Sequence, residues 1–170
     1  MVVSDKAMIT NELDQKWMKE ALKEAKLAFS KKEIPIGAVV VYEDQIIGRG
    51  YNQVESLNDA TAHAEILAIT AASNFLNSWR LSGASIYVTV EPCIMCAGAI
   101  SLARLDRLVF GTLDPKKGGV SSLYNILQDQ RLNHRVQIEK GVLEEECSQL
   151  LTVFFKEVRQ SKVTANGGEN

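Results

Sequence analysis

The run SIYVTV at residues 85–90 constrains the fold of this chain more than any other feature of the sequence. It is rich in β-branched residues and has no polar face, which is typical of a strand buried on both sides. A strand of this kind needs a packed layer against each face of its sheet. Pro92 ends the run, and the sequence CIMCAGAISLA that follows has the pattern of a helix.

The other helices and strands are predicted from shorter patterns on either side of this run. Apolar residues at helical spacing predict helices over residues 14–32, 62–75 and 142–160, the second of them capped by Thr61. Strands are predicted at 36–42 and 46–52, as a hairpin, and at 107–111 and 135–141, the last at a sheet edge. This order predicts an α/β fold, a three-layer α/β/α sandwich with a mixed sheet of about five strands.

Length and composition favour a single domain with its own core. The chain has 170 residues, 46% of them apolar and 24% charged, as is ordinary for a globular protein. Residues 1–160 are predicted to form one domain, and the small polar residues of 161–170 a disordered tail.

No segment predicts an association with a membrane. No run approaches the roughly 18 apolar residues of a membrane span. The N-terminal sequence has acids where a signal peptide has a basic and then an apolar segment. We therefore expect a cytoplasmic protein. Its formal charge of −2 counts against non-specific coating of nucleic acid but is compatible with a local basic patch.

The sequence TAHAEI places His63, one of only two histidines, two residues before Glu65 at the start of a predicted helix. Taken alone, the pair also fits a core histidine with a satisfied hydrogen bond and an ordinary acid in a first helical turn. A second motif, EPCIMCAG, has Cys93 and Cys96 spaced i, i+3 at the start of another helix. Taken alone, this CxxC fits either a redox pair or half of a zinc site.

Together the two motifs provide the ligands of a catalytic zinc ion. The chain has three cysteines, too few for a Cys₄ site, and Cys147 falls on the apolar stripe of the last helix, where a cysteine acts as a core residue. His63, Cys93 and Cys96 are three protein ligands, the number that leaves a fourth position open for water. Zinc lowers the pKa of such water toward about 7, and Glu65 is placed to pass its proton to the substrate.

HxE followed by PCxxC is the signature of the zinc nucleobase deaminases. From about residue 17 to residue 159 the chain further resembles the bacterial tRNA-specific adenosine deaminases, in segments that include EIPIGAVVV, GRGYN, TAHAEI, YVTVEPCIMCAGAI, RLVFGTLDPKKGG, SLYNIL and LNHRV. The resemblance implies a cytidine-deaminase-like fold and a homodimer with one Zn²⁺ per subunit.

The implied reaction is hydrolytic conversion of adenosine to inosine at the wobble position of a tRNA anticodon. An arginine tRNA with an ACG anticodon is the expected substrate. The base must be splayed out of the anticodon loop to reach buried zinc, so double-stranded DNA is not expected as a partner.

The resemblance also implies roles for single residues. By position, His63, Cys93 and Cys96 match the zinc ligands, Glu65 the proton donor, and Asn52 an asparagine that hydrogen-bonds the target base. On its own sequence context, Asn52 also fits a turn-forming residue after a strand. Two departures from the family pattern are Ala60, where proline is usual, and Leu113, where a polar or basic residue is common.

The implied RNA contacts lie in a loop and near the C-terminus. Asp114 matches a loop aspartate that contacts a neighbouring anticodon-loop nucleotide. Lys116 is expected either to meet phosphates or to be solvated. Phe154 and Phe155 match an aromatic pair, of which one is expected in the core and Phe155 is assigned to the RNA cleft. His134 is expected to be structural.

Three other interpretations remain. The nearest is a deaminase of a free base or nucleotide, such as guanine or cytosine, because guanine deaminases have a similar EPCxMC segment. A zinc-holding subunit without catalysis is a second, against which the presence of Glu65 argues. A redox protein using Cys93 and Cys96 is the third, and measured zinc content would exclude it.

Overall fold

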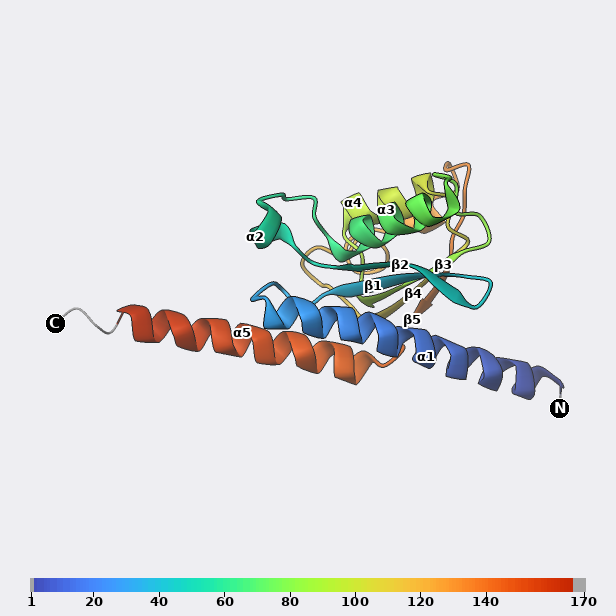
Figure 1. Cartoon of the computed structure of the whole chain (residues 1–170). Helices are drawn as coiled ribbons and strands as arrows, with labels where there is room; N and C mark the ends of the chain where they lie inside the picture. The colour runs from blue at the N-terminus through green and yellow to red at the C-terminus, as the bar shows by residue number, and fades with distance from the viewer. Residues whose placement is uncertain (1, 167–170) are drawn as a thin grey trace.

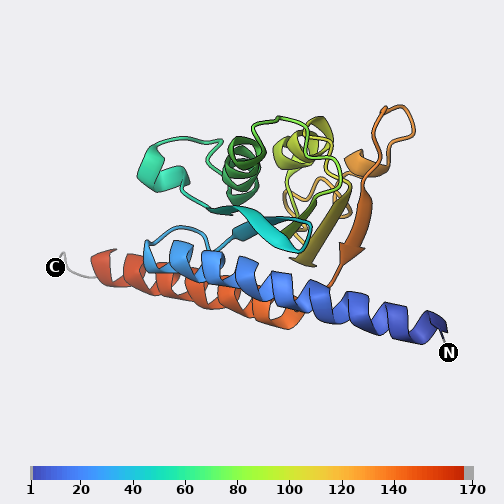
Figure 2. The same cartoon turned by 45° about the vertical axis from the view of Figure 1, so that its right-hand side comes forward.

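A five-stranded sheet lies between two layers of helices (Figures 1 and 2). The computed structural model describes the backbone of residues 2–166 and the side chains of residues 11–164. The strands are β1 (Gly37–Tyr42), β2 (Gln45–Tyr51), β3 (Ser85–Val90), β4 (Arg107–Thr112) and β5 (Gln137–Lys140). The helices are α1 (Val2–Ser30), α2 (Val54–Leu57), α3 (Ala64–Leu76), α4 (Ile94–Leu102) and α5 (Glu144–Asn166), with a 3₁₀ turn at Ile126–Gln128. The predicted three-layer sandwich is confirmed.

The sheet is mixed, in the order β2-β1-β3-β4-β5. β1 pairs antiparallel with β2 and β3, whereas β3–β4 and β4–β5 are parallel. The hairpin turns through Glu43 and Asp44, both with positive φ, as a tight two-residue turn between twisted strands requires. The central strand β3 is buried along nearly its whole length, and β5 is at an edge, as the sequence predicts.

The layer formed by α1 and α5 covers one face of the sheet. The two helices lie side by side and run in the same direction (Figures 1 and 2). Met18 and Ala21 of α1 pack with Val39 and Val109 of the sheet in one apolar cluster. Asp14, also on α1, is buried and accepts hydrogen bonds from Arg107 of β4 at 2.6 and 2.8 Å and from the Tyr87 hydroxyl of β3 at 3.0 Å.

The opposite layer is formed by α3 and α4. The close packing of α3 against the sheet determines where the first turn of α3 lies. Three of the buried residues of α3 are alanines that belong to the core cluster: Ala64, Ala68 and Ala72. The close contact between α3 and β2 requires a glycine at position 50, because a Cβ on Gly50 would overlap the Ala64 carbonyl oxygen. The first turn of α3 therefore lies against the end of β2, next to Asn52.

Several predicted elements have different boundaries in the structure. α1 begins at Val2, well before residue 14, because good helix formers such as Ala7 and Met8 precede the amphipathic stripe. α3 begins at Ala64, and Thr61 does not cap it, because the Thr61 hydroxyl donates to Asp59 instead. The polar stretch after Asn52, predicted as a loop, contains the short helix α2.

The last helix continues beyond the predicted domain boundary. α5 extends to Asn166, so residues 161–166 of the predicted disordered tail are helical, and residues 167–170 lie outside the described residues. The hydroxyls of Ser161 and Thr164 donate to carbonyl oxygens one turn earlier in the same helix. None of the helices within residues 2–166 is both long enough and apolar enough to cross a bilayer.

Candidate active site

His63, Cys93 and Cys96 meet where α3 and α4 begin. His63 is the N-cap residue of α3 and Cys93 that of α4, and both have extended backbone conformations. The His63 Nδ1 atom lies 3.6 Å from the Cys93 sulfur and 3.5 Å from the Cys96 sulfur. The two helices therefore bring their N-termini to the same end of the sheet, as their order around β3 predicts.

The geometry of this group fits a tetrahedral metal ion. Its three ligand atoms all lie within 4.8 Å of one another. Nitrogen and sulfur ligands of one zinc ion, bound at about 2.0 to 2.3 Å, are roughly 3.5 Å apart. One imidazole and two thiols are also the softer ligand types that zinc prefers. The three residues can hold a metal ion and leave one coordination position open.

Hydrogen bonding within the group already favours a thiolate. The interaction between the two cysteines lowers the pKa of Cys93 to about 3 and raises the pKa of Cys96 well above its ordinary value. The hydrogen bond between His63 and Cys93 raises the pKa of the histidine. Cys93 thus presents a negative charge to a cation, which is the form that metal binding requires.

Glu65 lies in the first turn of α3, beside this group but outside the set of three. Its side chain is buried, and this burial raises the pKa of Glu65 to about 7. Its carboxyl also takes part in a hydrogen bond with Cys96. A carboxyl with a pKa near neutrality can accept and release a proton at physiological pH, which is the property of a general acid–base.

Asn52 follows β2 directly and is buried next to the start of α3. Its backbone N–H donates to the Ile36 carbonyl at 3.0 Å. Among the described residues, none forms a hydrogen bond with the Asn52 side-chain amide. The amide is therefore available to a ligand at this end of the sheet.

Asp114 and Lys116 lie in the loop after β4. Asp114 Oδ1 accepts hydrogen bonds from the backbone N–H groups of Lys116 and Lys117, at 3.0 and 3.1 Å, so this carboxylate shapes its own loop. The loop lies next to the candidate metal ligands, because Gly118 forms a β-bridge with Cys93. The Lys116 side chain is exposed.

The structure does not bring Phe155 to the histidine–cysteine group. Phe155 is 41% exposed on α5, which belongs to the layer on the other side of the sheet. Phe154 is buried and packs edge-on against Phe29 of α1, so the expectation that one of the pair lies in the core is confirmed. His134 donates to the Leu105 carbonyl at 2.7 Å, a contact of the kind expected for a structural histidine.

Two buried carboxylates near the site were not singled out from the sequence. Glu33 accepts hydrogen bonds from the backbone N–H groups of Glu55 and Ser56 and so holds α2, close to Asn52. Glu91 accepts hydrogen bonds from the loop that contains Asp114. Its position beside Pro92 in EPCIMCAG was the available signal, but a sequence does not show which backbone groups a side chain meets.

Cys147 is buried in the core, as predicted. It is 1% exposed on α5, and burial raises the pKa of its thiol to about 12.

Cys147→Ala should therefore leave one zinc per chain and lower the stability by about 1 kcal/mol. Cys96→Ala should lose the metal. Metal analysis of the two purified variants tests this, and loss of zinc in Cys147→Ala would show that the ligand set is wrong.

The class of protein follows from this site and from a family model. Nucleobase deaminases combine HxE and PCxxC motifs around one metal ion and keep the glutamate off the metal. The arrangement of His63, Cys93 and Cys96, with Glu65 beside them, has this form. Residues 12–159, most of the chain, match the family model of the MafB19-like deaminases. The protein is a deaminase.

Comparison with curated proteins narrows the class. The chain is 51% identical over 152 residues to the tRNA-specific adenosine deaminase of Bacillus subtilis (strain 168), covering 89% of this chain and 94% of that protein. It is 44% identical, with a TM-score of 0.77, to a structure from studies of A-to-I editing by tRNA:A34 deaminases at the wobble position; this likeness covers 79% of this chain and 98% of that one. The chain belongs to the tRNA-specific adenosine deaminase family.

A guanine deaminase from Nitrosomonas europaea has the same fold. It is 22% identical to this chain, with a TM-score of 0.72 and coverage of 82% of this chain and 83% of that one. At this identity the likeness extends to the fold alone.

Proposed function

We propose that this chain converts adenosine to inosine at the wobble position of a tRNA anticodon, with an arginine tRNA bearing an ACG anticodon as substrate. The observation that most supports this is the His63–Cys93–Cys96 group beside buried Glu65, in a chain about half identical to tRNA-specific adenosine deaminases.

In this proposal His63, Cys93 and Cys96 hold one Zn²⁺ per subunit. The zinc ion supplies a Lewis acid that lowers the pKa of a water molecule toward about 7. Glu65 would take up a proton from the water as the water oxygen adds to C6 of the adenine, and would return it to the ring. A second proton, passed from the added hydroxyl to the amino group, would let the C6–N bond break and ammonia leave. Burial supports this role, because it keeps the Glu65 carboxyl able to exchange a proton near neutral pH.

The proposed substrate contacts surround the group. The Asn52 amide hydrogen-bonds the splayed-out adenine, and Asp114 meets a neighbouring anticodon-loop nucleotide. Lys116 contacts a phosphate, and Phe155 contacts RNA at a more distant point on α5. The exposure of Lys116 and Phe155 supports these two assignments.

The proposed setting is a homodimer in the cytoplasm, with residues 1–160 as one deaminase domain in each subunit. Membranes and double-stranded DNA are not partners in this proposal. A base inside a duplex does not reach a buried group unless it is unstacked, which supports an anticodon loop as the substrate.

The second candidate is deamination of a free base or nucleotide, such as guanine or cytosine. The EPCIMC segment favours it, because guanine deaminases have a similar EPCxMC segment. The two candidates differ in what must enter the site, because a free base makes no use of Asp114 or of the lysine beside it.

Parallel assays with the purified protein separate the two candidates. One uses an arginine tRNA with an ACG anticodon, and the others use adenosine, cytidine and guanine. We expect inosine at the wobble position and no ammonia from the free compounds. Ammonia from guanine or cytidine, with the tRNA unchanged, would support the second candidate and refute the first.

A further inference from the structure

Glu91 is a buried carboxylate whose hydrogen bonds all go to one loop. Glu91 Oε1 accepts from the backbone N–H groups of Val120, Ser121 and Ser122 at 3.2, 2.7 and 2.8 Å. Glu91 Oε2 accepts from the Asp114 N–H at 3.0 Å and from the Ser122 hydroxyl. The residue is 3% exposed. Five donors from residues 114–122 thus converge on one side chain, which we call the Glu91 anchor.

The anchored loop lies against the start of α4. The Gly119 N–H donates to the Pro92 carbonyl at 2.8 Å, and Gly118 forms a β-bridge with Cys93. Gly118 lets the loop approach this closely, because a Cβ there would overlap the Glu91 carboxylate. The loop position is therefore fixed relative to the residue that begins α4 and supplies one sulfur of the candidate metal group.

The same loop presents the residues assigned to substrate. Asp114 and Lys116 belong to it. The N–H of Asp114 donates directly to Glu91, so the anchor acts on the backbone of a proposed RNA-contacting residue. Glu91 itself is buried beneath the loop and does not present its carboxylate to solvent.

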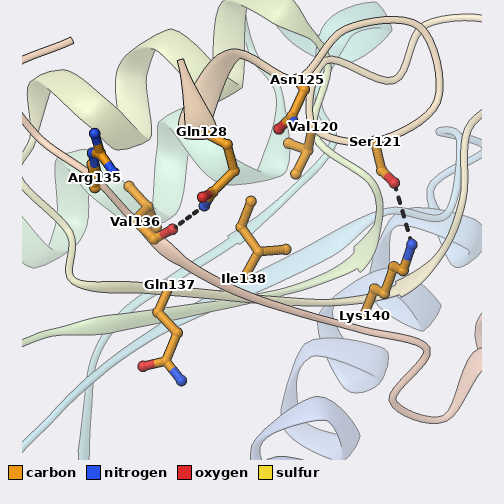
Figure 3. Close-up of a pocket in the computed structure, with 9 residues that line it drawn as sticks. All are labelled: Val120, Ser121, Asn125, Gln128, Arg135, Val136, Gln137, Ile138 and Lys140. Carbon is orange, nitrogen blue, oxygen red and sulfur yellow. Dashed lines mark hydrogen bonds between the residues drawn. The ribbon is translucent and has the colours of Figure 1, made fainter. Parts of the chain in front are cut away.

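The outer side of the loop is held more weakly. There a pocket of about 610 Å³ lies between the loop and β5, as Figure 3 shows. Lys140 reaches across it to the Ser121 hydroxyl at 3.4 Å, and Gln128 donates to the Val136 carbonyl at 2.7 Å. One long, exposed hydrogen bond from Lys140 is weaker than the five hydrogen bonds to Glu91, so Glu91 is the main side-chain acceptor that holds residues 114–122.

We propose that Glu91 is a positioning residue for the substrate. It holds the loop of residues 114–122 as a wall of the active site, in fixed register with the first residues of α4, and so sets affinity for RNA without contacting the RNA or the metal. This proposal rests on the tRNA substrate proposed above. Its structural part, that Glu91 holds this loop, does not depend on the substrate.

Glu91→Gln tests the proposal, because it keeps the shape of the side chain but replaces one acceptor oxygen with an NH₂ group facing donors. We expect the KM for tRNA to rise about tenfold, equivalent to about 1.4 kcal/mol, with kcat within about threefold of the parent and one zinc per chain. Hydrogen exchange of residues 114–122 should become at least about tenfold faster.

Asp14→Asn is the matched control. Like Glu91, Asp14 has a buried carboxylate, and it accepts three hydrogen bonds. It lies on α1, on the opposite face of the sheet from α4. It should lower the melting temperature without changing the KM or the exchange of residues 114–122. If Glu91→Gln does not fold, Ser122→Ala removes a single donor to the anchor and should change both quantities in the same direction, about threefold.

The possible results separate the two proposals. An unchanged KM, or a fall in kcat alone, in Glu91→Gln would overturn the positioning role. Unchanged exchange of residues 114–122 would overturn the anchor itself. A parent protein that leaves tRNA unmodified would refute the proposed function instead, while the exchange measurement would still show whether Glu91 holds the loop.

Discussion

Replacing Glu65 with alanine should reduce inosine formation by at least about 10² to 10⁴-fold while the protein stays folded with its zinc bound. Glu65 is buried beside the candidate ligands, and its pKa of about 7 suits it to move a proton in either direction. The group of three candidate ligands found among the described residues contains no carboxyl of its own. Single-turnover rates on tRNA measure the loss of inosine formation, and metal analysis of the same sample measures the bound zinc.

Two further variants make this result specific to proton transfer. Glu65→Gln keeps the volume and the hydrogen-bonding capacity of the side chain but does not transfer a proton at neutral pH, so it should be as inactive as alanine. Glu55→Ala removes an exposed glutamate from nearby α2 and should retain the parent rate. Loss of zinc from Glu65→Ala, or a rate within about tenfold of the parent, would show that Glu65 has another role.

Asp14→Ala should produce the largest loss of stability, about 3 kcal/mol, without a change at the active site. The substitution leaves the Arg107 guanidinium and the Tyr87 hydroxyl without their shared carboxylate between α1 and the sheet. Breaking a buried ion pair costs about 3 to 5 kcal/mol of stability. Because the Arg107 side chain is 15% exposed, we expect a loss at the lower end of that range. Thermal unfolding should show a melting temperature lower by about 6 to 12 °C.

The control for this prediction is Glu12→Ala. Glu12 is an exposed acid on the same helix, so its removal should change the stability by no more than about 0.5 kcal/mol. Equal effects of the two substitutions would mean that the Asp14–Arg107 pair does not stabilise the contact between α1 and the sheet.

The parts of the fold that depend on periodicity were predictable from the sequence. The apolar run of β3 required a layer on each face of the sheet, and the structure has both. The polar residues after β1 predicted the hairpin. Helix ends were less predictable, because they depend on local competition for hydrogen bonds. Thr61 bonds to Asp59 instead of capping α3, and α5 remains helical through Ser161 and Thr164.

The candidate site was predictable where motif spacing determines it and not where tertiary contacts do. His63, Cys93 and Cys96 meet because two helices begin at the same end of the sheet, which their order in the chain implies. The position of Glu91 in EPCIMCAG gives no information on the groups that it contacts. Its five donors come from residues 23 to 31 positions later in the chain, so its role is visible only once the loop has folded over it.

The central claim is that a metal held by His63, Cys93 and Cys96 enables this chain to deaminate the wobble adenosine of tRNA. The most direct measurement is a zinc titration of metal-free protein, with inosine at the wobble position of an ACG arginine tRNA measured at each step. The account predicts no inosine without zinc, and a rate that rises in proportion to added zinc and levels off at one ion per chain. Inosine formation by the metal-free protein, or tRNA left unmodified at full zinc occupancy, would contradict it.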